Sequence, residues 1–354
     1  MSTVSDPARE MAGSLTVKSN WARFVADTPT PPDLLPPQQW RQLSEAARED
    51  YDELRLRHHA RLVTVATPLV NEISRLGRRL VLLNRDQFSA RRGLVVSGQA
   101  GTGKSTAITQ LGKHHEIRSR RRRGAVQGPY LPVVYITVPP AATPKTLAGE
   151  LARFVGLPIK NRASQVDITN SLCDVLDRLG TDLVLVDEIH NISLETRAGA
   201  DASDQLKYLA ERISATFVYA GIDVEAKGLF SGTRGRQIAG RFASIETRPF
   251  ANGTTIQRQE WGALVATLEQ ALCLHRLPEG RLLRHADYLH QRSGGMIGSL
   301  AHLIREAAVE AILDGTETIT KASLGRVRLD HAAEHQEHTR PALRGTSARV
   351  GSHR

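Results

Sequence analysis

A phosphate-binding pattern lies in the first third of the chain, at residues 98–105. These residues are GQAGTGKS and match G-x-x-x-x-G-K-S/T. The pattern directly follows the apolar run GLVVS and directly precedes the helix-like segment TAITQLGKHHE, which is the context that a phosphate loop needs. A glycine-rich turn that binds nothing is the alternative, and the placement between strand and helix argues against it. We therefore expect a site for ATP.

Each part of this segment has an expected role. Glycines let the backbone approach phosphate oxygens closely, and the N–H groups that open a helix supply positive dipoles. Lys104 is expected to reach the β- and γ-phosphates, Ser105 to bind Mg²⁺, and Thr106 to lie near the α-phosphate. The expected cofactor-binding residues of this segment are Gly98, Gln99, Ala100, Gly101, Thr102, Gly103, Lys104, Ser105 and Thr106.

A second run, LVLVDE, ends in adjacent carboxylates at Asp187 and Glu188. Asp187 is expected to hold Mg²⁺ directly or through water, and Glu188 to polarise the attacking water as a general base. The alternative is a strand end with two solvated acids. His190 and Asn191 follow at once, and such a polar pair either senses the γ-phosphate or lies in an exposed loop.

Short apolar runs separated by helical stretches predict an α/β fold, with a parallel sheet flanked by helices. The expected strands are Gly93–Ser97, Pro132–Val138, Asp182–Val186 and Ala215–Ala220. After Pro249 the strand signal ends, and three helices of a smaller C-terminal domain are expected at Gln257–Leu274, Glu279–Gln291 and Ile297–Leu313.

The start of the chain is expected to be loop-like up to about Pro37, because five prolines interrupt helix and strand ladders alike. Two helices broken near Pro68 are expected between Gln38 and Asp86. The expected domains are a partly disordered N-terminal extension at 1–50, an ATPase domain with its leading helices at 51–250, a helical lid at 251–328 and a disordered basic tail at 329–354.

The charge balance favours a polyanionic partner. The chain has 47 Lys plus Arg against 37 Asp plus Glu, a formal net charge of +10. An arginine cluster is expected in a loop before the second strand, where it can contact DNA phosphates with little sequence preference; a solvated loop is the alternative. Without interleaved aromatic residues, duplex DNA is favoured over single strands. The expected DNA-binding residues are Arg118, Arg120, Arg121, Arg122 and Arg123.

Other features exclude whole classes of protein. With only Cys173 and Cys273, neither a disulfide framework nor a cysteine-type zinc site can be built. No run approaches the roughly 20 apolar residues of a membrane span, so a cytoplasmic protein is expected. The tail histidines His331, His335 and His338 have helical spacing but no evident further metal ligand.

Taken together, these segments resemble the AAA+ ATPases, and within them the TniB/TnsC-like ATP-binding proteins of transposons. The resemblance covers roughly residues 51–324. It rests on GQAGTGKST, LVLVDEIHNIS, LKYLAERISATFVYAGID, RFASIETRPF and SGGMIGSLAHLIREAAVEAI.

This resemblance implies an AAA+ sheet with a helical lid, ATP and Mg²⁺ as cofactors, and a homo-oligomer or filament. It also implies assembly on target DNA and recruitment or stimulation of a DDE transposase, with a target-selection adaptor as a further possible partner. The family's arginine finger completes the site of a neighbouring subunit, and Arg241 looks like the matching position, with Arg234 and Arg236 as alternatives.

Two departures from the family pattern favour slow hydrolysis. Ile222 and then Asp223 stand where many relatives have a polar sensor, and the lid segment GMIG at 295–298 has no sensor arginine. Two other functions remain open. One is a different DNA-associated AAA+ ATPase, such as a replication initiator or helicase loader. The other is a nucleotide-switched scaffold that recruits proteins and uses hydrolysis only to reset itself.

Overall fold

The computed structural model describes residues 13–61, 64–125, 127–160, 162–192, 196–225 and 240–329. These residues form two compact units, which we name the sheet unit and the helical unit. The sheet unit comes from residues 13–30 and 64–248, and the helical unit from residues 31–63 and 249–329. In neither unit does a described helix combine the length and apolar character of a membrane span.

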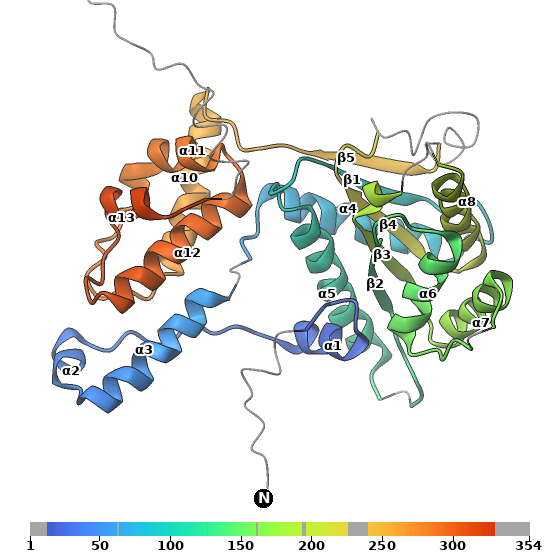
Figure 1. Cartoon of the computed structure of the whole chain (residues 1–354), viewed down its shortest axis with the longest axis horizontal. Helices are drawn as coiled ribbons and strands as arrows, with labels where there is room; N and C mark the ends of the chain where they lie inside the picture. Colours follow the sequence, from blue (N-terminus) through green and yellow to red (C-terminus); the bar gives the residue numbers. More distant parts are fainter. Residues whose placement is uncertain are drawn as a thin grey trace, which may run out of the picture. The chain divides into compact units, whose positions relative to one another are not determined.

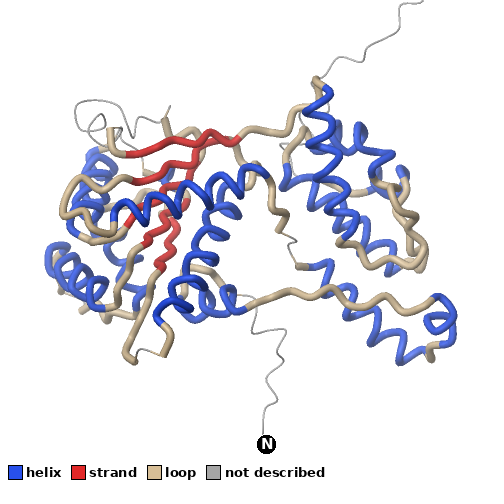
Figure 2. The backbone as a smooth tube through the Cα atoms, turned by 180° about the vertical axis from the view of Figure 1, so that it is seen from behind, coloured by secondary structure: helices blue, strands red, loops and turns tan. Residues whose placement is uncertain are grey.

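A five-stranded parallel sheet forms the core of the sheet unit (Figures 1 and 2). The strand order is β2-β3-β4-β1-β5. Every residue of β1, β3 and β4 is buried, as their continuous apolar runs predict. The expected α/β class is confirmed. The strands are β1 (Gly93–Gly98), β2 (Val133–Thr137), β3 (Leu183–Asp187), β4 (Thr216–Gly221) and β5 (Phe242–Thr247).

Strand β5 is absent from the sequence prediction. It pairs only with β1, so it is an edge strand, and only Ile245 and Thr247 of its six residues are buried. An edge strand needs no continuous apolar run, because one side of it faces away from the sheet. Its sequence, FASIET, therefore gives little signal of a strand.

Helices pack around this sheet, and α5 contacts β1, β2, β3 and β4 along its length. Thr67 and Thr143 cap α4 and α6, each followed by proline at the first helical position. The helices are α1 (Lys18–Ala26), α4 (Pro68–Asn84), α5 (Lys104–Arg123), α6 (Pro144–Val155), α7 (Gln165–Arg178) and α8 (Arg197–Arg212), with the short η2 (Ile189–Asn191) after β3.

Two expectations for this unit need correction. The segment before Pro37 contains α1, whose Trp21 is fully buried, rather than only loop. The arginines 118 and 120–123 lie in the last turns of α5 rather than in a loop. Arginine is a good helix former, and positive charge at a helix C-terminus is favoured by the helix dipole, which explains the longer helix.

The helical unit combines a segment from before the sheet with the C-terminal helices. Its α3 packs against α12, so the chain from residue 51 to residue 61 lies in this unit rather than with the sheet, where it was expected. The helices are α2 (Pro37–Gln42), α3 (Glu45–Ala60), α10 (Thr255–Gln270), η3 (Leu283–His285), α11 (Ala286–Ser293), α12 (Ile297–Leu313) and α13 (Lys321–Arg326).

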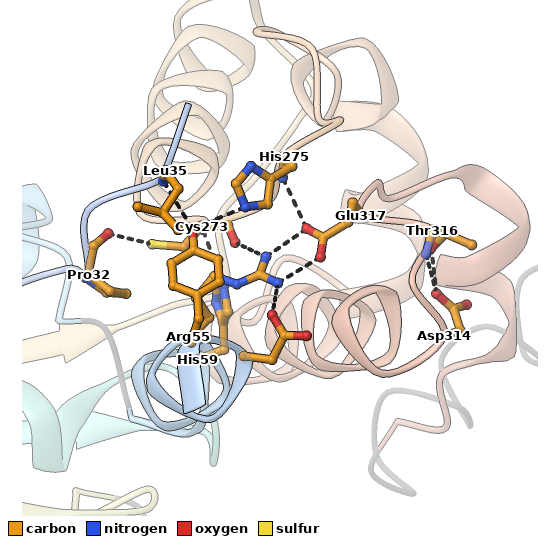
Figure 3. Close-up of polar contacts among 11 residues, drawn as sticks. Pro32, Leu35, Arg55, His59, Cys273, His275, Asp314, Thr316 and Glu317 are labelled. Carbon is orange, nitrogen blue, oxygen red and sulfur yellow. Dashed lines mark hydrogen bonds and ion pairs between the residues drawn. The ribbon is translucent and has the colours of Figure 1, made fainter. Parts of the chain in front are cut away.

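A buried ion pair joins α3 to the C-terminal part of the helical unit (Figure 3). Arg55 is fully buried, and its two terminal nitrogens each lie 2.7 Å from an oxygen of Glu317, which is 1% exposed. Arg55 also donates to Asp52 and to the carbonyl of Cys273, while the backbone N–H of His275 donates to Glu317. The charges are thus paired and hydrogen-bonded on several sides, as buried charges must be.

We expect Arg55→Ala to lower the free energy of unfolding by about 3–5 kcal/mol, because it leaves the Glu317 carboxylate buried without its cation. Arg57→Ala is the matched control, since Arg57 pairs with Glu53 where both side chains are about half exposed. That change should cost less than about 1 kcal/mol. Urea denaturation of both variants measures the difference, and equal losses would contradict a structural role for the buried pair.

Candidate nucleotide-binding site

The phosphate loop connects the end of β1 to the start of α5. Its glycines Gly98, Gly101 and Gly103 have φ values of 148°, 77° and 90°, which side chains disfavour. A Cβ at Gly98 would lie 2.1 Å from the carbonyl oxygen of Thr247 on β5. Thr102 closes the loop, because its hydroxyl donates to the carbonyl of Gln99 at 2.8 Å. The glycines at these positions are therefore required by the backbone itself.

Lys104 is the first residue of α5 and is only 7% exposed. Its Nζ donates to the carbonyl of Gln99 at 2.6 Å. Burial lowers the pKa of Lys104, and the negative charges of Glu188, Asp187 and Asp223 act in the opposite direction. The side chain is therefore a buried cation held inside the loop, with three carboxylates near enough to act on it.

The start of α5 is suited to an anion. Gly103 occupies the N-cap position and has no side chain that could accept from the first N–H groups. No acidic residue lies in the first turn, so the positive end of the helix dipole faces no side-chain carboxylate there. Together with Lys104, these N–H groups fit a phosphate group.

Asp187 ends β3 and is 3% exposed. Both of its oxygens accept hydrogen bonds: Oδ1 from the backbone N–H of Glu188 at 2.8 Å and Oδ2 from the hydroxyl of Tyr135 at 3.0 Å. Burial, and then the charge of Asp187, raises the pKa of Tyr135, so the phenol keeps its proton and donates. These contacts fix the orientation of the Asp187 carboxylate.

A magnesium ion fits the oxygen groups at the carboxyl ends of β1 and β3. Ser105, exposed in the first turn of α5, and Asp187 offer the hard oxygen ligands that Mg²⁺ prefers. Among the described residues, no group of three His, Cys, Asp or Glu side chains forms a metal site by itself. That is expected for Mg²⁺ held with a nucleotide, because the ion usually keeps waters and binds substrate phosphates as well as one or two protein groups. The tail histidines lie outside the described residues.

Glu188 follows β3 in a left-handed conformation, with φ of 55°. Its Oε2 lies 3.1 Å from Nε2 of His190, whose Nδ1 accepts from the backbone N–H of Ile222 at 3.2 Å. Because Nδ1 is the acceptor, the neutral ring carries its proton on Nε2, the nitrogen nearest to Glu188. The side chain of His190 is 14% exposed, so it is not a freely solvated loop histidine. Asn191 instead donates to the carbonyl of Val138.

Two contributors to this site are not assigned from the sequence. Asp223 follows β4 in a left-handed conformation and acts electrostatically on Lys104. Its only sequence signal is its place two residues after an apolar strand. Tyr135 lies within the apolar strand β2, and a single tyrosine there gives no signal of contact with Asp187.

Arg241 lies at the amino ends of the strands, whereas the phosphate loop lies at their carboxyl ends. It precedes β5, and its carbonyl accepts from Gly93 at the start of β1, whereas the phosphate loop follows the end of β1. The six residues of β1 that pair with β5 separate the amino ends from the carboxyl ends of these strands by about 20 Å. Its guanidinium pairs with Glu211 of α8 at 2.9 Å. The structure therefore does not bring Arg241 to Lys104 of the same chain. Arg234 and Arg236 lie outside the described residues.

The arginines at the end of α5 divide into two groups. Arg120 pairs with the buried carboxylate of Glu116, and Arg123 lies over the ring of Tyr130 at 4.3 Å. By contrast, burial and then the positive charges of Arg78, Arg122 and Arg121 lower the pKa of Arg118. We name this second group the basic face, comprising Arg78 of α4 and Arg118, Arg121 and Arg122 of α5.

Comparison with known proteins agrees with this architecture. The sequence model of the bacterial TniB protein family matches residues 64–252, which include the whole nucleotide site. No curated protein matches the sequence.

Several solved structures share the fold. The Aeropyrum pernix ORC1 protein, solved in complex with DNA, has a TM-score of 0.58 and 17% identity, with 78% of this chain and 66% of that one covered. The Aeropyrum pernix ORC2 protein, in ADPNP-ADP complexes, has a TM-score of 0.54 and 17% identity, with coverages of 72% and 65%. Drosophila ORC bound to DNA has a TM-score of 0.52 and 14% identity, with coverages of 91% and 73%.

This likeness establishes an AAA+ fold with an α/β core and a helical C-terminal region. This chain spans slightly less than two thirds of the length of the two Aeropyrum proteins.

We expect Lys104→Ala to weaken binding of a fluorescent ATP analogue by about 10–100-fold, because a hydrogen bond between charged groups contributes about 1.5–3 kcal/mol. Lys145→Ala is the control, since Lys145 is an exposed lysine on α6. Fluorescence anisotropy titrations measure both. Unchanged affinity in the Lys104 variant would contradict the assignment of the site.

Proposed function

Because the chain belongs to the bacterial TniB family, we propose that it is an ATP-dependent, DNA-binding AAA+ regulator of DNA transposition. In this proposal the protein oligomerises on target DNA and recruits or activates a DDE transposase, with a target-selection adaptor as a further partner. The observation that carries the ATP-dependent part is the convergence of Lys104, Asp187 and Glu188 at one edge of the sheet. A cytoplasmic location follows from a partnership with DNA.

Hydrolysis is assigned to named groups at that edge. Lys104 and the N–H groups of the phosphate loop bind and orient the β- and γ-phosphates. Ser105 and Asp187 hold Mg²⁺, which when bound neutralises charge on the phosphates. Glu188 accepts the proton of the attacking water, and His190 orients Glu188 through the 3.1 Å contact. Asp223, which follows β4 and acts electrostatically on Lys104, is the candidate for sensing the state of the γ-phosphate.

The position of Arg241 supports assembly into an oligomer. Within its own chain this residue lies a strand length away from the phosphate loop, so it can act as an arginine finger only in a neighbouring subunit. A positive charge supplied by a neighbour stabilises the charge of the transition state, and this dependence couples hydrolysis to oligomer formation. The single-chain site is then incomplete until subunits meet.

DNA binding is assigned to the basic face. Three of its four arginines lie near the far end of the 20-residue helix α5, about 20–27 Å along the helix from the phosphate loop. Arg118, Arg121 and Arg122 have i, i+3 and i+4 spacing and so share one side of the helix. Mutual repulsion among these arginines is relieved when phosphates replace water and counterions around them. Arg120 and Arg123, which have partners within the chain, contribute less.

The two other functions differ in the partner that they require. The fold likeness to ORC proteins also suits a replication initiator or helicase loader, and copurification with a replicative helicase rather than a transposase would favour that function. A recruitment scaffold would bind its partner protein whether or not ATP is hydrolysed. The match to the TniB family over residues 64–252 favours transposition.

We expect binding to a nonspecific DNA duplex to require ATP and to weaken with salt. In the double variant Arg121→Gln/Arg122→Gln, the slope of log K against log salt should fall by about 2, because two phosphate contacts are lost. Arg120→Gln/Arg123→Gln removes the same charge from the same helix and is the matched control. Anisotropy titrations with ATP, ADP or no nucleotide over a salt series measure these effects.

A smaller effect of the control pair supports the basic face. Equal effects of both pairs would show that only net charge matters, and absence of DNA binding in every nucleotide state would move the assignment to the recruitment scaffold. Melting temperatures of both variants check that the helix stays folded.

A further inference from the structure

The N-terminal helix α1 packs beside α5 (Figure 1). Its tryptophan, Trp21, belongs to the core of the sheet unit. Trp21 is fully buried, with a relative exposure of 0%. Its indole crosses α5 at Gly112, where a Cβ would lie 2.7 Å from the ring. The indole N–H donates to the buried carboxylate of Glu116. Glycine in the middle of this helix is thus explained by the space that Trp21 needs.

A lysine of α5 fastens the other end of α1. Lys113 Nζ donates to the carbonyl of Phe24, in the last turn of α1, and to the carbonyl of its C-cap residue Asp27. It also lies 4.9 Å from the centre of the Phe24 ring. The C-terminal end of a helix carries a partial negative charge, so a cation there is stabilising. The helix is therefore held by an apolar contact at Trp21 and a polar contact at Lys113.

The same tryptophan contacts the strand that orients Asp187. The ring of Trp21 stacks on the ring of Tyr135, with centroids 5.8 Å apart and planes 13° apart. Tyr135 in turn donates its hydroxyl to Oδ2 of Asp187. A continuous line of contacts thus connects the N-terminal helix, through one tyrosine, to the candidate magnesium ligand.

The hydroxyl of Tyr135 is not needed to fill space. The residue is 7% exposed among apolar neighbours, so phenylalanine would occupy nearly the same volume. The hydroxyl does supply a hydrogen bond to the one oxygen of Asp187 that the backbone of Glu188 does not hold. Groups that hydrogen-bond to a metal ligand fix its orientation and tune metal affinity.

We propose that Tyr135 is a positioning residue for Asp187, and that Trp21 of α1 holds Tyr135 in place. The N-terminal helix thereby sets the affinity of the site for the Mg²⁺–nucleotide complex. This inference rests on the proposed ATPase function. A partner that displaced α1 would weaken the site without contacting the nucleotide.

The test compares tyrosine variants at two strands of the same sheet. Tyr135→Phe should raise the Mg²⁺ concentration for half-maximal binding of a fluorescent ATP analogue by about tenfold, with binding in EDTA and the melting temperature nearly unchanged. Tyr219→Phe is the control, because Tyr219 is also buried in the sheet but stacks on Phe242 instead. It should leave the Mg²⁺ dependence unchanged.

Variants of α1 test the second half of the proposal. Trp21→Ala should raise the Mg²⁺ concentration for half-maximal binding to a similar degree. Trp21→Phe keeps an aromatic ring against Tyr135 and should bring that concentration most of the way back to the value of the unaltered protein. Lys113→Ala loosens α1 without opening a cavity in the core, and it replaces Trp21→Ala should that variant not fold. When Trp21→Ala or Lys113→Ala is combined with Tyr135→Phe, the Mg²⁺ requirement should rise little further, because both changes act through the contact between Tyr135 and Asp187.

The outcomes separate the inference from the function beneath it. If the unaltered protein binds the nucleotide without any dependence on Mg²⁺, the proposed ATPase site itself is wrong. If binding depends on Mg²⁺ and Tyr135→Phe leaves that dependence unchanged, the role of Tyr135 is overturned. If Tyr135→Phe shifts it but neither Trp21→Ala nor Lys113→Ala does, the role of α1 is overturned.

Discussion

Parallel strand pairing is the constraint on which the site depends. In a parallel sheet all carboxyl ends meet at one edge, and the order β3-β4-β1 puts the ends of three separate chain segments next to one another. Lys104 is therefore within electrostatic reach of Asp187, Glu188 and Asp223, although almost 120 residues separate the first from the last in sequence. Their charges matter because Lys104 is buried, where electrostatic interactions are stronger than in water.

The same geometry puts Arg241 and the basic face out of reach of the phosphate loop in the same chain. Arg241 precedes β5 at the amino ends of the strands, and three of the four arginines of the basic face lie near the far end of α5. Among the residues that the structure describes, the cation of Arg241 is thus held away from the phosphate loop and the carboxylates of its own chain. In the proposed oligomer the neighbour supplies that cation, so ATP binding, assembly and DNA contact depend on one another.

Sequence alone predicted the parts of the site that are contiguous in the chain. The phosphate loop and the LVLVDE run each combine their chemical groups with the strand that positions them, and four of the five strands have continuous apolar runs. The edge strand β5 has a mixed pattern, and α1 depends on one tryptophan whose burial only the folded chain reveals. The contact from Tyr135 to Asp187 was equally hidden, because it joins residues 52 positions apart.

The most direct test of a site shared between subunits is ATP hydrolysis by mixed variants. Glu188→Gln and Arg241→Ala should each be nearly inactive alone. An equal mixture should recover about a quarter of the unaltered activity, because in about a quarter of the interfaces an intact Glu188 meets an intact Arg241 from its neighbour. Hydrolysis by Arg241→Ala alone at the rate of the unaltered protein, or no recovery in the mixture, would contradict the account.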